Sequence, residues 1–484
     1  MLRFPSFNLL CYSRLMENSY LSLPPLFYQR VKASTFTKVS LLLFNENLSQ
    51  QLGLELDGVC KEELADIFSG QKLLAGSMPI ALAYAGYQFG HPVPLLGDGR
   101  AMLLGEMNGQ DIQLKGSGQT PYSRRGDGLS ELGPVLREYI VSEFMHTFGI
   151  PTTRALAAVL TGQEVYRQFG AVPGAVFTRV ASSHLRVGTF QLASFNQDQE
   201  ALIELLDYTV KRHYPHLSGL PLQQRALTFL AAVGEKQGEL IAKWSSVGFI
   251  HGVMNTDNCS VAGITIDYGP CAFMDEFSFN KVFSSIDERG RYSYFNQVPI
   301  IQWNILRLAD CLLPLISQNQ EEAISLVENM LHPILGRFHH LRMKYLASKL
   351  GINDYQEEDE VLVMDFLKYL EESSLDFTLA FRNLWQIYNE ENEFYPESIR
   401  LNSFIEQWKL RVKDISGLHL INPLYIPRNH LVQKAIELSY QGEMSFTHRL
   451  LEVLADPFTE REGFQEFSQP PKDSEKVLRT YCGT

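Results

Sequence analysis

The chain has 484 residues, a formal net charge of −13 and 45% hydrophobic residues. A chain of this length usually folds into two or more lobes. Its acidic balance argues against binding to nucleic acid or anionic lipid, since no basic run is longer than Arg124-Arg125. No apolar run approaches the roughly 18–20 residues that cross a bilayer. The six cysteines lack Cys-x-x-Cys spacing, which favours a reducing compartment over a disulfide framework or a zinc knuckle.

The N-terminal part of the chain says little about function. Met1–Leu15 carry two arginines but lack the long apolar segment of a signal peptide. Met16 is an alternative start, because the stretch after it reads as folded protein. Residues 1–75 mix short helical patterns with breaks such as Pro24-Pro25. We predict that they form an N-terminal extension.

Residues 76–180 change character. Within Leu95–Gly118, short apolar runs are separated by Gly, Asp and Asn-Gly, a pattern typical of antiparallel strands and turns. From Pro134 onward apolar residues recur at helical spacing, until Gly149 and Pro151 end the pattern. The segment predicts a small β-rich lobe with one prominent helix.

Residues 181–420 are dominated by helical patterns. An example is Leu222–Val247, which Gly248 stops. One short hairpin is expected, with Cys259–Val261 paired to Ile264–Ile266 around a turn. This segment predicts a large, mainly helical lobe.

The order of these segments predicts the fold class. A small β-rich lobe followed by a large helical lobe is the α+β layout of a two-lobed, protein-kinase-like enzyme, with ATP expected in the cleft between the lobes. Residues 421–484 would form a C-terminal extension.

Lys115 and Glu138 are the first candidate pair. Lys115 ends a predicted strand, and Glu138 lies 23 residues later in the predicted helix. In kinase-like folds, a helix glutamate holds a strand lysine against the nucleotide phosphates. On its own such a pair is more often two solvated surface charges.

Glycine-containing turns and two arginines are weaker candidates. Gly97-Asp98-Gly99-Arg100 and Gly126-Asp127-Gly128 could bring backbone N–H groups to phosphate, although such turns are common without a ligand. None fits the Walker A pattern. Arg179 and Arg186 could clamp a triphosphate, because a guanidinium matches phosphate bidentately, or they could be surface charges.

The most specific pattern begins at His251 and ends at Asp267. It follows the kinase order of His-x-Asp-x-x-x-x-Asn and then an Asp-Phe-Gly-like turn, with Asn258 and Asp267 as oxygen ligands for Mg²⁺. Valine occupies the usual catalytic aspartate position, at Val253, so ordinary phosphoryl transfer should fail. Asp257 is the nearest replacement acid. The alternative is that Asp257 and Asn258 only cap a turn.

These motifs resemble the selenoprotein O / YdiU family of protein adenylyltransferases, from about Met16 to Thr484. Several long segments carry the resemblance in the same order along the chain. They are Tyr84–His91, Gly97–Arg100, Gln113–Gly118, Pro121–Gly128, His251–Asn258, Asp267–Pro270, Asn422-Pro423 and Arg428-Asn429.

The resemblance implies transfer of AMP from ATP to Ser, Thr or Tyr hydroxyls of proteins, including the enzyme itself, with release of pyrophosphate. Asp257 would accept the hydroxyl proton, as a weak base near its reference pKa of about 4. Glu138 would hold Lys115, and Asn258 and Asp267 would ligate Mg²⁺, with Mn²⁺ as an alternative. The residues expected to contact ATP are Gly97, Gly99, Arg100, Lys115, Asp127, Gly128, Arg179, Arg186 and Asp267.

The resemblance also implies a redox contact, and here the sequence departs from the family. Cys482 matches the family's cysteine or selenocysteine third from the C-terminus. Its expected partner region, Phe277–Ser285, has no cysteine, which leaves Cys271 as the hypothetical partner. We expect a monomer that binds no nucleic acid and no membrane, located in the cytoplasm, or in mitochondria if the source is eukaryotic.

Two other functions stay open at this stage. A conventional phosphotransferase would transfer the γ-phosphate, which Val253 argues against. A non-catalytic, nucleotide-binding pseudokinase scaffold would bind ATP without turnover, which the retained Asp257, Asn258 and Asp267 argue against.

Overall fold

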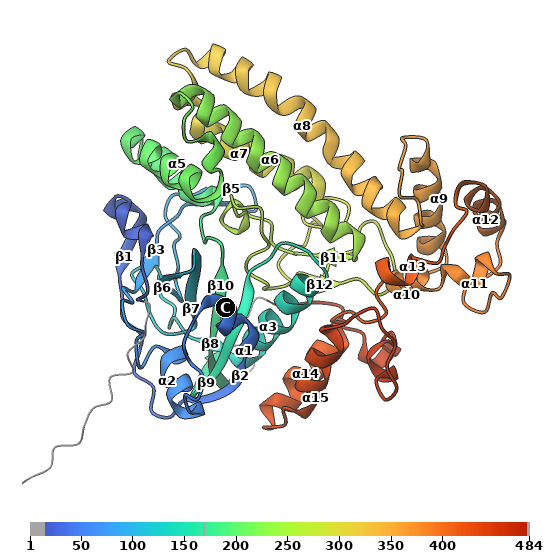
Figure 1. Cartoon of the computed structure of the whole chain (residues 1–484), viewed down its shortest axis with the longest axis horizontal. Coiled ribbons are helices and arrows are strands. Elements are labelled where there is room, and N and C mark those ends of the chain that lie inside the picture. The colour runs from blue at the N-terminus through green and yellow to red at the C-terminus, as the bar shows by residue number, and fades with distance from the viewer. Residues whose placement is uncertain (1–14, 168–169, 482–484) are drawn as a thin grey trace, which may run out of the picture.

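The computed structural model describes residues 15–167 and 170–481. They form a lobe built on an antiparallel sheet and a lobe of long helices (Figure 1). The predicted α+β, two-lobed class is therefore confirmed, and the likeness to protein kinases stays a prediction.

The main sheet has eight strands in the order β1-β3-β6-β7-β10-β9-β2, with β8 paired to β10. The two edge strands come from the first 75 residues, so the sheet crosses the boundary expected at residue 75. The strands are β1 (Tyr28–Arg30), β2 (Ser40–Phe44), β3 (Ile80–Leu82), β6 (Ala101–Met107), β7 (Gln110–Lys115), β8 (Ser130–Glu131), β9 (Arg154–Arg167) and β10 (Gly170–Ala181).

The sheet is covered on both faces. Helices α1 (Glu46–Leu52) and α2 (Lys61–Ser69) share one apolar core with β6, β7, β9 and β10. Helix α3 (Leu132–Thr147) packs against β9 and β10 in a second core, which continues into the helical lobe. The predicted helix after Pro134 is confirmed, and the chain leaves it through Gly149 at a positive φ of 78°.

The helical lobe is organised around α6, α7 and α8, which lie side by side in Figure 1. The expected end of α6 is confirmed, because Gly248 follows it with φ 67°. The helices are α4 (Val187–Phe195), α5 (Gln199–His213), α6 (Leu222–Ser246), α7 (Gln297–Ile316), α8 (Gln320–Lys349), α9 (Asp359–Glu372), α10 (Phe377–Arg382), α11 (Leu384–Tyr388), α12 (Ile399–Arg411), α13 (Leu418–Ile421), α14 (Asn429–Tyr440) and α15 (Ser445–Leu454).

Two small sheets lie outside the main one. Strands β4 (Gly86–Gln88) and β5 (His91–Val93) form a hairpin, and β11 (Phe249–Ile250) pairs with β12 (Ala272–Phe273). The predicted hairpin of Cys259–Val261 with Ile264–Ile266 is wrong. A turn forms there, but one arm bridges Arg186 and the other bridges Thr152. The backbone groups of the two arms therefore find their partners in the segments before α4 and β9.

Helix α7 meets the length and composition of a membrane span, and no other helix of the described ranges does. Its most apolar 18-residue window is 56% buried inside the protein, and the helix packs against α4, α6 and α8. A core helix accounts for these features, and the absence of membrane binding stays a prediction.

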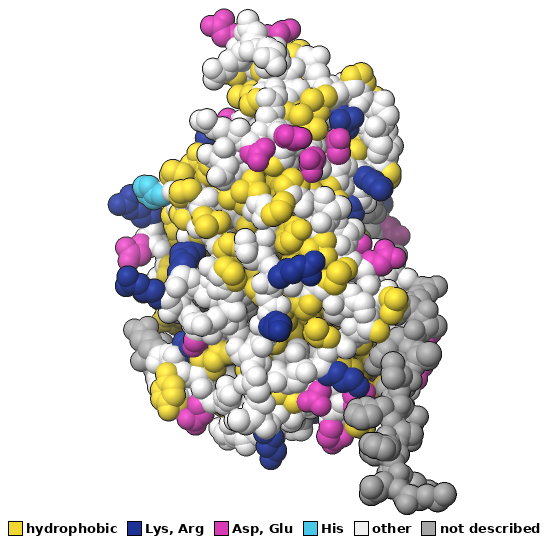
Figure 2. Space-filling model, turned by 90° about the vertical axis from the view of Figure 1, so that its left-hand side faces the viewer, with side chains coloured by type: hydrophobic (Ala, Val, Ile, Leu, Met, Phe, Trp, Pro, Cys, Tyr) yellow, Lys and Arg dark blue, Asp and Glu magenta, His cyan; other side chains and the backbone are white. Residues whose placement is uncertain are grey.

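The molecular surface is uneven in its chemistry. Figure 2 shows one face on which apolar side chains gather across the middle, with lysines and arginines among them and acidic side chains mostly around the edge of this apolar area. Although the net charge of the chain is −13, parts of its surface therefore carry positive or apolar side chains.

Candidate active site

A cleft of about 1630 Å³ lies where the sheet lobe meets the segments after α6. All nucleotide, metal and proton-acceptor residues expected from the sequence line this cleft, and Glu138 contacts it through Lys115. These lining residues are Gly97, Gly99, Arg100, Lys115, Asp127, Gly128, Arg179, Arg186, Asp257, Asn258 and Asp267.

Asp267 lies at the centre of a cluster of three cations. Lys115 Nζ and Arg179 Nη1 both contact its Oδ1, at 2.9 Å and 2.6 Å, and Arg186 Nη2 lies 3.4 Å from its Oδ2. Burial by itself would raise the pKa of the Asp267 carboxyl, but these cations hold that pKa well below its ordinary value. Asp267 is therefore an ionised carboxylate at neutral pH.

Two further carboxylates hold the cations in place. Glu138, on α3, contacts Lys115 Nζ at 2.6 Å and Arg179 Nη1 at 3.1 Å, so the pairing expected for Lys115 is present and includes a second cation. Asp98 lies 3.7 Å from Arg186. Because the two carboxylates and both arginines are almost fully buried, their positions are fixed before any ligand arrives.

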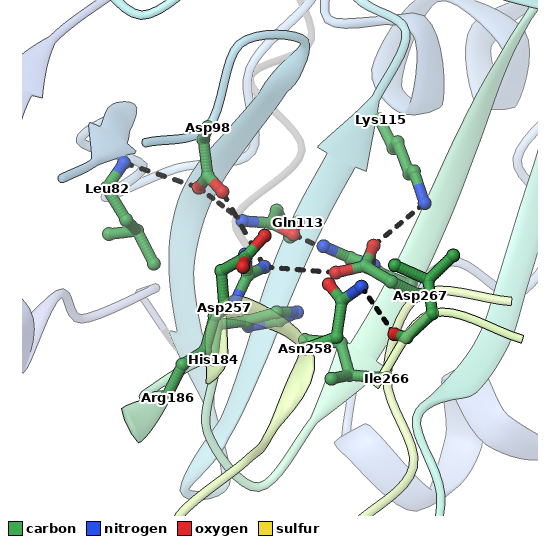
Figure 3. A network of polar contacts seen from close by, with 12 residues as sticks. Leu82, Asp98, Gln113, Lys115, His184, Arg186, Asp257, Asn258, Ile266 and Asp267 are labelled. Carbon is green, nitrogen blue, oxygen red and sulfur yellow. Dashed lines mark hydrogen bonds and ion pairs between the residues drawn. The ribbon is translucent and has the colours of Figure 1, made fainter. Parts of the chain in front are cut away.

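Asp98 and Gln113 belong to the same polar network, although the sequence analysis assigned neither of them to the site. Gln113 donates to Asp98 at 2.9 Å and accepts from Arg179 Nε at 2.7 Å, so it links the glycine-containing turn to the cation cluster (Figure 3). Both residues lie inside motifs that the sequence singled out, Asp98 between two glycines and Gln113 two residues before Lys115. A single sequence gives no sign that the two are buried together.

Asn258 stands beside Asp267 and adds an amide oxygen. Its Nδ2 donates to the carbonyl of Val253 at 3.0 Å, and Figure 3 shows the side chain facing Asp267. His251 braces the same region, because its Nε2 contacts the carbonyl of Ile266 at 3.0 Å and its ring stacks on Trp244. Asp267 itself has a φ of 64°, a strained conformation of the kind that clusters at active sites.

Asn258 and Asp267 fit a Mg²⁺ site of the kind that nucleotide enzymes use. Within the described residues no three His, Cys, Asp or Glu side chains gather closely enough to hold a metal by themselves. Mg²⁺ is commonly held by one or two protein oxygens together with substrate phosphates and water. An ionised carboxylate next to an amide oxygen in a cation-rich cleft matches that donor set.

Asp257 lies in a different environment from Asp267. Its side chain is buried, with 8% exposure of the residue; Gln88 donates to Oδ2 at 3.4 Å, and no described group hydrogen-bonds Oδ1. Burial raises its pKa to about 6, against the partial opposition of Arg186. The expectation of a pKa near 4 is therefore wrong, because the sequence does not show how completely this carboxyl is removed from water.

Gly86 and Gly97 leave room that the site requires. A Cβ atom at Gly86 would lie 2.8 Å from Asp257 Oδ1, and one at Gly97 would lie 2.4 Å from the ring of Tyr122. Gly97 also has a positive φ of 81°. A side chain at Gly86 would displace the Asp257 carboxyl, and one at Gly97 would displace Tyr122.

The rim of the cleft combines distant parts of the chain. Asp127 is paired with Arg167 of β9 at 2.7 Å; partial burial raises its pKa, but Arg167 and the Leu129 amide hold it below its ordinary value. From the C-terminal extension, Arg479, Thr480 and Tyr481 also line the cleft. The sequence analysis missed these last three, since no local motif marks them.

The redox prediction falls partly outside the described residues. Cys271 is buried, whereas Cys482 lies outside the described ranges. Thr480 donates its hydroxyl to the carbonyl of Pro270 at 2.6 Å and bridges Ser284, so the C-terminal segment runs beside residue 271. A Cys271–Cys482 disulfide stays a prediction.

A lysine and two arginines around an ionised aspartate, with an amide oxygen and glycine-containing turns in the same cleft, are the groups that a phosphate-transferring enzyme uses. Residues 11–455 match the family described as Protein adenylyltransferase SelO. The chain therefore belongs to the SelO family, as its motifs indicated, and it is a nucleotidyltransferase.

Curated relatives support the same assignment. The chain is 47% identical to Protein nucleotidyltransferase YdiU of Rhodopseudomonas palustris strain BisB18, over 97% of this chain and 99% of the relative. It is 46% identical to the protein of the same name from Agrobacterium fabrum, with the same coverage. The corresponding protein of Bradyrhizobium diazoefficiens is 44% identical.

Proposed function

We propose that the protein transfers AMP from ATP to Ser, Thr or Tyr hydroxyl groups of proteins, its own included, and releases pyrophosphate. The observation that carries the proposal is Asp257, a buried carboxyl with a raised pKa that lies in the same cleft as the Asp267 cation cluster. The cleft thus contains both a carboxyl that can accept a proton and cations that can neutralise phosphate charge.

Asp257 would act as the general base. As the acceptor oxygen bonds to the α-phosphorus, the bond from that phosphorus to the β-phosphate oxygen breaks, and the hydroxyl proton passes to the Asp257 carboxylate. A base with a pKa of about 6 is mostly ionised at pH 7 and accepts a proton more readily than an ordinary aspartate. Gln88 keeps the carboxylate oriented.

Lys115, Arg179 and Arg186 would neutralise the charge that develops on the phosphates. Their positions are fixed by Glu138, Gln113 and Asp98, so little reorganisation is needed during the reaction. Asn258 and Asp267 would hold Mg²⁺, or Mn²⁺, which when bound supplies further neutralisation of the phosphate oxygens. We also propose that the enzyme acts as a monomer in the cytoplasm.

Val253 favours this reaction over γ-phosphoryl transfer. Its side chain is apolar and 7% exposed, and its carbonyl accepts from Asn258. No carboxylate stands at the position where a kinase would hold its substrate hydroxyl. The acceptor must then be activated elsewhere in the cleft, and the Asp257 carboxyl, whose pKa is raised to about 6, is suited to that task.

The test compares ATP labelled at the α- or γ-phosphate, with Mg²⁺ and with the wild type or the Asp267→Ala variant. We expect protein labelling from the α label only, lost in the variant. Asp207→Ala, which removes a half-exposed carboxylate of α5, is the matched control and should label normally. Labelling from the γ position would instead establish a kinase, and ATP binding without any labelling would establish a scaffold.

A further inference from the structure

The β4–β5 hairpin is fixed directly to the segment that contains Asp257. The backbone N–H of Tyr87 donates to Thr256 Oγ1 at 2.7 Å, and that of Phe89 donates to Asn255 Oδ1 at 3.0 Å. Between them, Gln88 faces the cleft and reaches Asp257. Whatever binds the outer side of this hairpin is therefore held at a set position relative to the proton acceptor.

The outer side of the hairpin carries an aromatic cluster. Because side chains alternate along a strand, Tyr87 points away from Gln88 and packs edge-on against Trp303 of α7, with ring centroids 5.4 Å apart. Phe195, at the end of α4 and 37% exposed, meets Tyr87 at 5.9 Å. Tyr87 and Trp303 are also partly exposed.

Two arginines share the ring of Trp303. The Cζ of Arg291 lies 5.1 Å from the indole centroid and that of Arg307 lies 5.3 Å from it. Arg307 also lies 5.9 Å from the ring of Tyr87. Cation–π contacts of this kind hold guanidinium groups in fixed planes, ready for a carboxylate. We name the set Tyr87, Phe195, Arg291, Trp303 and Arg307 the docking patch.

The docking patch has more positive than negative charge. Arg307 pairs with Asp310, whose side chain is 53% exposed, whereas no carboxylate of the described residues forms an ion pair with Arg291. Among the described residues, the buried Nε atoms of Arg291 and Arg307 have no hydrogen-bond partner. On a chain with a net charge of −13, two arginines on one indole ring mark a site for an anionic partner.

The residue types are also those of binding hot spots. Trp, Tyr and Arg are the residues that contribute most to the centres of protein–protein interfaces. Tyr87 of this surface is adjacent in the chain to Gln88, which contacts Asp257. The surface is therefore placed to hold the acceptor protein. The nucleotide would bind elsewhere, because the cations proposed to bind its phosphates lie inside the cleft.

We propose that the docking patch binds the acceptor protein through a segment that carries an acidic and an apolar side chain a few residues from the modified hydroxyl. The acidic side chain would pair with the guanidinium group of Arg291 or Arg307, and the apolar one would pack on Tyr87, Phe195 and Trp303. This inference rests on the proposed AMP transfer to proteins.

The test uses arrayed synthetic peptides with a central Ser, Thr or Tyr and every residue type at each flanking position, together with α-labelled ATP, Mg²⁺ and the full-length protein. Wild type should favour Asp or Glu, and an apolar residue, at fixed offsets from the hydroxyl. The Arg291→Glu/Arg307→Glu double variant should raise the KM of the best acidic peptide about tenfold and should prefer Lys or Arg at the same offset.

Arg337→Glu is the matched control, because Arg337 lies on α8 with its side chain 61% exposed and pairs only with Glu235 among the described carboxylates. It should keep the wild-type preference. An unchanged melting temperature identifies double-variant protein that is folded. If wild type labels peptides and the folded double variant keeps the same acidic preference, the docking patch is wrong while AMP transfer stands.

Two other outcomes would also overturn the inference. If wild type labels no peptide and no protein, the proposed function fails together with it. If sedimentation shows a wild-type dimer that the double variant turns into a monomer, the docking patch is a contact between two copies of this chain instead.

Discussion

Asp267 and Asp257 line the same cleft and both are largely removed from water, yet burial has opposite consequences for them. Around Asp267, Lys115, Arg179 and Arg186 replace the lost water and lower the pKa of its carboxyl. Around Asp257, the amide of Gln88 donates at 3.4 Å and no cation lies in an ion pair within the described residues, so burial raises the pKa to about 6. One carboxyl is suited to binding cations and the other to moving a proton.

The contrast teaches that burial does not set the role of an acid by itself. Desolvation acts on both groups in the same direction, and the neighbours decide the outcome. Active sites often push the pKa values of two carboxyls apart in this way. The predictions below remove the neighbours or the acids one at a time.

The largest effect is expected for Asp267→Asn, which keeps the shape of the side chain and removes its charge. Lys115, Arg179 and Arg186 lose their shared anion, so we expect loss of AMP transfer by about 10³-fold or more. The protein should lose about 2–3 kcal/mol of stability. Label transfer and urea unfolding measure the two effects. Transfer within tenfold of wild type would contradict the role of Asp267.

The next largest effect is expected for Asp257→Asn. Loss of the proton acceptor should lower kcat by about 10²–10⁴-fold with little change in the KM for ATP. The same change should stabilise the protein at pH 7.5 by about 1–3 kcal/mol, because an ionised carboxyl no longer has to be buried. Asp267→Asn and Asp257→Asn should thus shift the free energy of unfolding in opposite directions. If both substitutions lowered the free energy of unfolding, the proposed difference between the environments of the two carboxyls would be wrong.

Lys115→Met tests how many cations Asp267 needs. Arg179 and Arg186 remain, so the variant should fold, while the loss of one phosphate-binding charge lowers kcat/KM by about 10–100-fold. Arg337→Met serves as the control, since Arg337 pairs with Glu235 and both side chains are 61% exposed. If activity is unchanged in Lys115→Met, the two arginines alone carry the charge neutralisation.

The pH dependence should separate the two acids in the wild type. Because the Asp257 pKa is raised in the folded state, the rate of AMP transfer should fall about tenfold per pH unit below about 6, as the base becomes protonated. The same shift destabilises the fold as pH rises from about 4 to 6. The lowered pKa of Asp267 contributes stability that is present above about pH 4 and lost as pH falls further. Single-turnover rates and melting temperatures between pH 4 and 8 provide the measurement.

The smallest effect is expected for Gln88→Leu. Without the amide that donates to Asp257 Oδ2, the pKa of Asp257 should rise above about 6 and the pH profile should move to higher pH, with a loss of about two- to fivefold at pH 7. Gln302→Leu, on α7, is a control that removes a glutamine bonded only to a backbone carbonyl in the described structure. An unshifted profile in Gln88→Leu would show that Gln88 does not influence the pKa of Asp257.

The sequence by itself determined several of the elements and most of the charged residues of the site. Strands β6 and β7, helix α3 and the end of α6 follow from apolar spacing and from glycine and proline breaks, which act within a few residues. The motifs around Lys115, Asp257 and Asp267 named the residues of the cleft and, through the family they resemble, the reaction, because that chemistry requires those residue types.

The tertiary structure alone decided which of these residues meet and how their charges respond. The arms around Ala262-Gly263 pair with Arg186 and Thr152 instead of each other, the two edge strands of the sheet come from the first 75 residues, and the raised pKa of Asp257 needs a burial that no local pattern reports. Contacts between distant segments and the exclusion of water depend on the packing of the whole chain, and local sequence cannot encode them.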